Sequence, residues 1–201
     1  MNTYTFLTFS LVLCLNCHSM NNIYLMDEKQ EQTNSYYNYF SVKIDPKADA
    51  NKVELEFVDV LYSPNLLTAF TDIVNPAFYK KIQITPKENG LNCILIKIDP
   101  SIYVFNAANI YFGSYPTKYE NKHEKGQDFY FDLDTRKEYT NLVYKGRLTI
   151  DSKNSSFRIE NKDQENCDLE LSKIYTKLDF KKTTNDAAIR EKRKLDEKNK
   201  K

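Results

Sequence analysis

Glycine, histidine and tryptophan are scarce in this sequence. Four glycines among 201 residues lie well below the usual level of about 7%, and glycine supplies the positive φ angles of phosphate-binding loops. Loops of that kind are therefore not expected. The absence of tryptophan weakens a sugar-stacking function. The two histidines, His18 and His123, are too few for a histidine-based zinc site.

The chain also has no excess of charge of either sign. It contains 29 basic and 28 acidic side chains, so it lacks the surplus of lysine and arginine with which nucleic-acid binders track phosphates. Nucleic acid is not expected as a partner. With 41% hydrophobic and 28% charged residues, the composition is too apolar for wholesale disorder and too polar for a polytopic membrane protein. The length allows one domain with a substantial core.

A long hydrophobic run is missing as well, and the longest one lies at the amino terminus. Residues 6–15 are apolar in the main, but ten residues of helix span about 15 Å, half of a hydrocarbon core of about 30 Å. This length is typical of the apolar region of a secretory signal. We therefore expect residues 1–16 to be a cleaved signal peptide and the polar residues 17–35 to be a tether.

The end of this leader, LCLNC, resembles the lipobox of bacterial lipoproteins, in its looser spirochaete-type form. Leu13 and Leu15 match the apolar part of the box, whereas Asn16 replaces the usual small residue, and Cys14 is a competing acceptor. The resemblance implies cleavage before Cys17 and attachment of diacylglycerol to its thiol. Long acyl chains would hold the protein on a membrane of the cell envelope, either the outer membrane or one facing the periplasm. Without acylation, the chain would be an ordinary secreted protein.

Residues 36–180 have the alternating pattern of β-strands. Apolar residues recur at every second position in the segments YFSVKI, KVELEF, KIQIT, DFYFDL, RLTI and SFRI. The polar turn DSKNS between the last two predicts a hairpin. Residues 93–96 are apolar on both faces, which predicts a central, buried strand.

Two segments have helical spacing instead. Ser63 and Pro64 form a helix start before a run of apolar residues that ends at Asn75 and Pro76. A second short helix is expected at about residues 168–178. Together these patterns predict a mainly β fold, namely an antiparallel β-sandwich with one or two short helices.

The closing hairpin and helix, LVYKGRLTI followed by SFRIENKDQENCDLELSKIYTKL, resemble those of small uncharacterised β-rich bacterial envelope lipoproteins. That family carries no established activity. The remaining residues, 181–201, hold nine basic and four acidic side chains. We expect them to form a charged tail, partly disordered or helical. Contact with anionic lipid is the functional alternative.

Cys93 and Cys167 are the cysteines beyond the leader. In an oxidising compartment they would form a disulfide that closes a loop of about 75 residues and stabilises the fold by up to about 4 kcal/mol. The alternative is two separate buried thiols.

Catalytic and metal-binding patterns are missing from the sequence. No G-x-S-x-G, H-E-x-x-H or nucleotide-binding motif is present. His123 lies in a charged segment. Asp128, Asp132 and Asp134 would share one side of a strand, where a polar face is expected rather than a calcium site. Four tyrosines gather in one stretch, as strand residues or as a binding surface: Tyr103, Tyr111, Tyr115 and Tyr119.

These observations predict a membrane-anchored envelope lipoprotein that acts as a binding or structural module rather than an enzyme. Its partners would be the membrane, through the acyl anchor at Cys17, and a protein of the envelope. We expect no catalytic residue, no metal site and no cofactor. The alternatives are an envelope enzyme or accessory subunit whose site is built from carboxylates and tyrosines, and an unanchored secreted protein.

Overall fold

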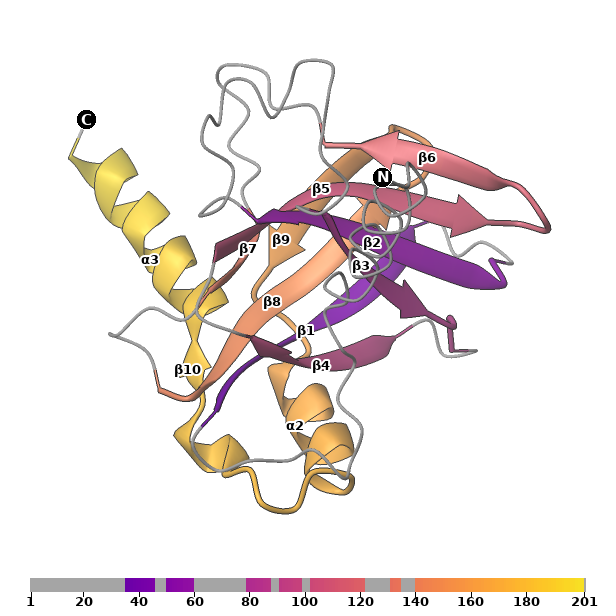
Figure 1. The fold of residues 1–201 in the computed structure, drawn as a ribbon. Coiled ribbons are helices and arrows are strands. Elements are labelled where there is room, and N and C mark those ends of the chain that lie inside the picture. Colours follow the sequence, from indigo (N-terminus) through magenta and orange to yellow (C-terminus); the bar gives the residue numbers. More distant parts are fainter. Residues whose placement is uncertain are drawn as a thin grey trace, which may run out of the picture.

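The computed structural model describes residues 35–45, 50–59, 79–87, 91–98, 102–121, 131–134 and 140–200. In these residues two β-sheets pack face to face, and helices lie against one of them (Figure 1). The prediction of a mainly β sandwich with short helices is confirmed. The signal peptide, residues 17–34 of the tether, the helix expected between Ser63 and Pro76, His123 and Asp128 all lie outside the described residues.

Sheet A contains the strands β1 (Tyr36–Asp45), β4 (Asn92–Ile98), β8 (Leu142–Asp151), β9 (Ser156–Glu160) and β10 (Thr184–Asn185). Their order is β10-β8-β1-β4, with β9 also pairing with β8. The predicted hairpin is present as β8 and β9, in which Leu148 pairs with Ile159 and Ile150 with Phe157. The pairs β1–β8 and β10–β8 are parallel, so sheet A is mixed rather than purely antiparallel.

Sheet B contains β2 (Lys52–Asp59), β3 (Tyr79–Ile84), β5 (Ile102–Tyr111), β6 (Pro116–Glu120) and β7 (Asp132–Asp134). All its described pairs are antiparallel, in the order β3-β2-β5-β6 with β7 also on β5. Alternation in β2 directs Val53, Leu55 and Phe57 into the space between the sheets.

The main core lies between the two sheets and is rich in phenylalanine. Phe40 of β1, Phe57 of β2, Phe105 of β5 and Phe131 are all buried, and their rings contact one another edge to face or tilted. Such aromatic packing adds to the free energy that burial itself supplies. Phe131 and Leu133 point inward as the alternation predicts.

Strand β4 is buried on both faces but is not central. Ile94 and Ile96 face the main core, and Leu95 faces a second core. Among the described strands β4 pairs with β1 alone and stands at the end of sheet A. The prediction of a central strand was wrong because sheet B covers one face of β4 and α2 covers the other, and burial of both faces does not require a second neighbouring strand.

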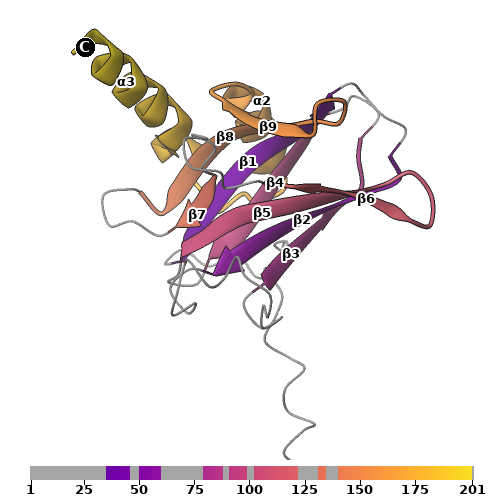
Figure 2. The same cartoon turned by 90° about the horizontal axis from the view of Figure 1, so that it is seen from above.

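That second core covers the outer side of sheet A. Tyr37, Tyr39 and Tyr144 of the sheet pack there against Leu171 and Phe180. The covering elements are α2 (Gln164–Ser172), the 3-10 turn η3 (Phe180–Lys182) and the start of α3 (Asp186–Asn199). Figure 2 shows both helices on the side of sheet A away from sheet B.

Helix α2 begins and ends earlier than the expected residues 168–178. Asp163, in the left-handed conformation with φ 69°, precedes its first turn. After Ser172 the backbone turns, and the Tyr175 amide donates to the Leu171 carbonyl at 2.8 Å. Tyr175 and Leu178 still pack in the second core, so their helical spacing reflected a shared buried side rather than a continuous helix.

Candidate functional site

Five charged side chains meet where sheet A, sheet B and α3 join: Asp132, Asp134, Lys145, Asp186 and Arg190. We call them the charge cluster. The Lys145 ammonium lies 2.9 Å from Asp186, 3.1 Å from Asp134 and 3.4 Å from Asp132. These four side chains are at most 1% exposed. Buried charges are tolerated at such a site only when they are paired.

Arg190 of α3 completes the charge cluster from the solvent side. Its guanidinium pairs with Asp132 and lies 2.7 Å from Asp186, with 23% of the side chain exposed. Burial alone would lower the pKa of Arg190, but the two carboxylates outweigh it and raise that pKa above its ordinary value. Both cations of the charge cluster therefore have fixed anionic partners.

A β-bulge places Lys145 in this position. Tyr39 pairs with Tyr144 and Ser41 with Arg147, so the one residue between them on β1 faces two residues of β8, Lys145 and Gly146. Gly146 in the bulge has φ 102°, and a Cβ there would meet the Glu160 carbonyl oxygen at 2.9 Å. The extra residue reverses the alternation, because Tyr144 faces the second core while Leu148 faces the main core. A bulge re-aims a side chain in this way.

The expectation that Asp132 and Asp134 form a solvated polar strand face was wrong. Both carboxylates are buried because Lys145 and Arg190 neutralise them. Within the described segments, no three His, Cys, Asp or Glu side chains converge in an arrangement suited to a metal ion. The sequence signal that was missed is Lys145 itself, a lysine preceded by the apolar run LVY in a strand.

A second polar network joins sheet A to the chain around α2. The Tyr39 hydroxyl donates to Asp168 and lies 3.3 Å from the Thr183 hydroxyl. Arg147 forms a two-point pair with Asp163, which also accepts from Ser41 at 3.0 Å. These contacts tie α2 and η3 to the strands beneath them.

Burial controls the titration of the two tyrosines in this network. It raises the pKa of Tyr144 to about 12. Burial, together with the hydrogen bond to Asp168, raises the pKa of Tyr39 far above its ordinary value. Both phenols remain protonated at physiological pH, so they serve as hydrogen-bond donors rather than as nucleophiles or bases.

The structure joins Cys93 and Cys167 in a disulfide, with 5.4 Å between their Cα atoms. Of the two alternatives raised by the sequence, the separate thiols are therefore not seen. Cys93 lies on β4 and Cys167 on α2, so the bond fixes the helix across the end strand of sheet A.

The outer face of sheet B carries a ladder of opposite charges. Lys81 of β3 lies 3.0 Å from Glu54 and 3.6 Å from Glu56, both on β2. Burial would raise the pKa of Glu54, but the hydrogen bond and the charge of Lys81 outweigh it and lower that pKa. Lys81 is half-exposed, whereas Glu54 and Glu56 are nearly buried. Cross-strand pairs of opposite charge contribute roughly 0.2–1 kcal/mol each.

Exposed aromatic side chains gather at the turn between β5 and β6. Phe112 is 49% exposed and Tyr115 is 88% exposed. Of the four tyrosines noted in this stretch, Tyr103 and Tyr119 are buried, whereas Tyr111 is half-buried and Tyr115 lies at the turn. The structure thus divides that group into core residues and surface residues.

Comparison with known proteins leaves the site without a precedent. No family model matches the chain, and no curated protein or solved structure is significantly similar to it. A search for membrane-spanning helices among the described residues finds none of sufficient length and apolarity. Cys17 and His18, like His123, lie outside those residues.

Proposed function

We propose that this chain is an exported lipoprotein of the cell envelope, acylated at Cys17, whose β-sandwich acts as a rigid binding or structural module. The observation that carries the proposal is the Cys93–Cys167 disulfide. Disulfides persist in oxidising compartments such as the periplasm and the cell surface, and they are rare in the cytosol. This agrees with the apolar leader and its cysteine, which were identified independently.

The buried polar groups support a module rather than an enzyme. The charge cluster and the network around Tyr39 both join separate elements, and their charged side chains are paired with one another. Catalytic groups usually face a cavity large enough for a substrate, and their shifted pKa values leave them free to react with it. Here the perturbed groups hold α2 and α3 on sheet A.

Cell fractionation of a bacterium that expresses the full chain tests this proposal. We expect wild-type protein in the membrane fraction with its disulfide formed, as alkylation of free thiols before and after reduction would show. The Cys17→Ala variant should be soluble or unprocessed, because it lacks the proposed acylation site. The matched Cys14→Ala variant should remain in the membrane fraction. Wild-type protein in the soluble fraction, like Cys17→Ala, would support the unanchored alternative instead.

A further inference from the structure

The turn between β5 and β6 presents two aromatic side chains beyond the body of the sandwich. We call residues 112–115 the aromatic tip. Phe112 and Tyr115 are the most exposed aromatic side chains of the described residues. Nothing lies within 4 Å of the position that a Cβ would take at Gly113. The tip therefore projects into open space, as the β5–β6 hairpin does in Figure 1.

The aromatic tip is braced from its base. The Asn51 amide donates to the Tyr111 carbonyl at 2.9 Å, and the Asn51 side chain donates to the Gly113 carbonyl at 3.5 Å. These bonds connect the turn to the start of β2. Because the backbone is held before any contact forms, binding through the tip would cost little ordering entropy.

One basic side chain, Lys52, lies at the base of the aromatic tip, and the nearest acidic residue of β2 is Glu54, whose pKa the charge of Lys52 helps to lower. The Lys52 ammonium lies 3.9 Å above the ring of Tyr111. Residues 50–53 and 110–117 include no acidic side chain. An apolar end with a cation at its base suits an anionic surface, since each basic residue close to anionic lipid contributes about 1 kcal/mol.

We propose that the aromatic tip inserts into the headgroup region of an anionic lipid bilayer and so lays the domain against the membrane that holds it. Phenylalanine and tyrosine supply the apolar body, and tyrosine and tryptophan are the residues enriched at membrane–water interfaces. A stable protein interface buries about 800 Å² on each partner, far more than two side chains on a convex turn offer. A bilayer needs only that the rings enter it. This inference rests on the proposed function, which supplies the membrane.

The tether is long enough for the anchor and the tip to share one bilayer. The Asn38 side chain, near the start of β1, donates to the Asp134 carbonyl at 3.0 Å, and Asp134 pairs with Ile102 at the start of β5. The tip follows the opposite end of β5, about 30 Å away for a ten-residue strand. Residues 17–35 extend to about 60 Å at most, so the tether spans this distance.

Fluorescence of a single introduced tryptophan tests the contact, because the chain has none of its own. The full chain with Phe112→Trp is placed in vesicles of phosphatidylcholine and phosphatidylglycerol that contain brominated lipids. We expect a blue shift and strong quenching of the tryptophan. The matched Leu169→Trp variant replaces another exposed apolar residue, on α2 and 61% exposed, and should remain unquenched.

Further measurements test the proposed contact of the aromatic tip with lipid. Omitting phosphatidylglycerol should reduce quenching in Phe112→Trp severalfold, because Lys52 then lacks an anionic surface. Absence of quenching in Phe112→Trp, or equal quenching in Leu169→Trp, would overturn the inference. A contact through α3 would also overturn the inference. In that case quenching at position 112 would persist after Tyr115→Ala, but would be abolished by replacing Lys192, Arg193 and Lys194 with glutamine.

Failure of the anchor and failure of the tip give different results. Adding Cys17→Ala to the Phe112→Trp chain removes acylation but leaves the aromatic tip intact. Quenching by added vesicles in this chain would support the tip whatever happens to the anchor. Acylated wild-type protein combined with an unquenched Phe112→Trp chain would retain the proposed function and reject the tip.

Discussion

Lys145 is surrounded by three carboxylates in a part of the core that solvent does not reach. The desolvation of each charge is compensated only by its partners, so the loss of one partner leaves the others uncompensated. The five residues of the charge cluster come from β7, β8 and α3, which makes the cluster a junction of both sheets with the last helix.

We predict that Lys145→Met lowers the free energy of unfolding by about 3–5 kcal/mol. Within the charge cluster, the buried carboxylates would then have Arg190 as their remaining cation. Urea denaturation measures this loss. The control, Lys192→Met on the exposed end of α3, should change stability by no more than about 0.5 kcal/mol. A loss below about 1 kcal/mol at Lys145 would contradict the account of the charge cluster.

Glu160 makes the stability depend on pH. Partial burial opposes its ionisation, but hydrogen bonds from Lys162 and Thr149 and the charges of Lys162 and Arg158 lower its pKa to about 2, from an ordinary value of 4.5. Because the folded-state pKa is depressed, the contribution is complete above about pH 4.5 and disappears as the pH falls toward 2.

We therefore predict that Glu160→Gln reduces the loss of stability between pH 7 and pH 3. Urea midpoints at the two pH values give the comparison. Glu197→Gln, on the exposed end of α3, should lose as much stability on acidification as the wild type. An identical acid response in wild type and Glu160→Gln would show that Glu160 does not contribute in this way.

The helices and strands show which parts of the structure can be predicted from sequence patterns. Alternation identified β1, β2 and the β8–β9 hairpin, because one side of each strand faces the main core. It failed at Asp132 and Asp134, whose neutralising partners lie on β8 and α3. Their burial depends on a bulge at Gly146 and on a helix that begins more than 50 residues later. Such tertiary pairings leave no local pattern.

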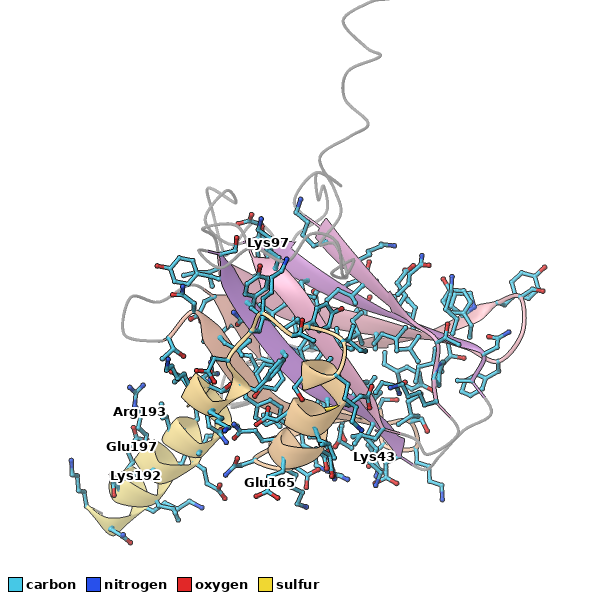
Figure 3. The ribbon with its side chains drawn as sticks, turned by 90° about the horizontal axis from the view of Figure 1, so that it is seen from below. Lys43, Lys97, Glu165, Lys192, Arg193 and Glu197 are labelled. Atoms are coloured by element: carbon cyan, nitrogen blue, oxygen red, sulfur yellow. A yellow bond between two sulfur atoms is a disulfide. The ribbon has the colours of Figure 1, made fainter. Side chains whose placement is uncertain are left out.

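The carboxyl-terminal residues show the same limit. Their charge suggested a tail beyond residue 180. The end of α3 is exposed, with Lys192, Arg193 and Glu197 pointing away from the sheets in Figure 3. The start of α3 nevertheless contributes Asp186 and Arg190 to the charge cluster, and Asn185 caps the helix by accepting from the Ala188 amide at 2.8 Å.

Truncations separate the two halves of α3. A chain that ends at Lys194 should keep nearly the wild-type stability, because it loses exposed residues alone. A chain that ends at Asn185 should lose about 3–5 kcal/mol, since Asp186 and Arg190 are removed from the charge cluster. Thermal unfolding followed by circular dichroism measures both. Equal melting temperatures for the two truncated chains would refute this division.

The disulfide should stabilise the attachment of α2 to β4. We predict that the double variant Cys93→Ala, Cys167→Ala loses about 2–4 kcal/mol of folding free energy, because the bond closes a long loop in the unfolded chain. Melting curves with and without reductant provide the measurement. Reductant should lower the melting temperature of the wild type and leave the double variant unchanged. A wild type that is insensitive after complete reduction would argue against this role.

At the scale of the whole molecule, the two helices and the aromatic tip lie in different parts of the domain. α2 and α3 cover the outer side of sheet A, while the aromatic tip extends the far end of sheet B (Figure 2). The proposed tether would join the domain at the start of β1, at the other end from the tip. A domain held at both ends against a bilayer would present a constant face to its surroundings, as a structural or binding module requires.

The intact mass of the membrane-extracted protein tests the proposed anchor at Cys17. We predict a mature chain that begins at Cys17 and is heavier by acyl groups, with the Cys17→Ala variant released or unprocessed. An unacylated chain cleaved at another position would contradict the anchor.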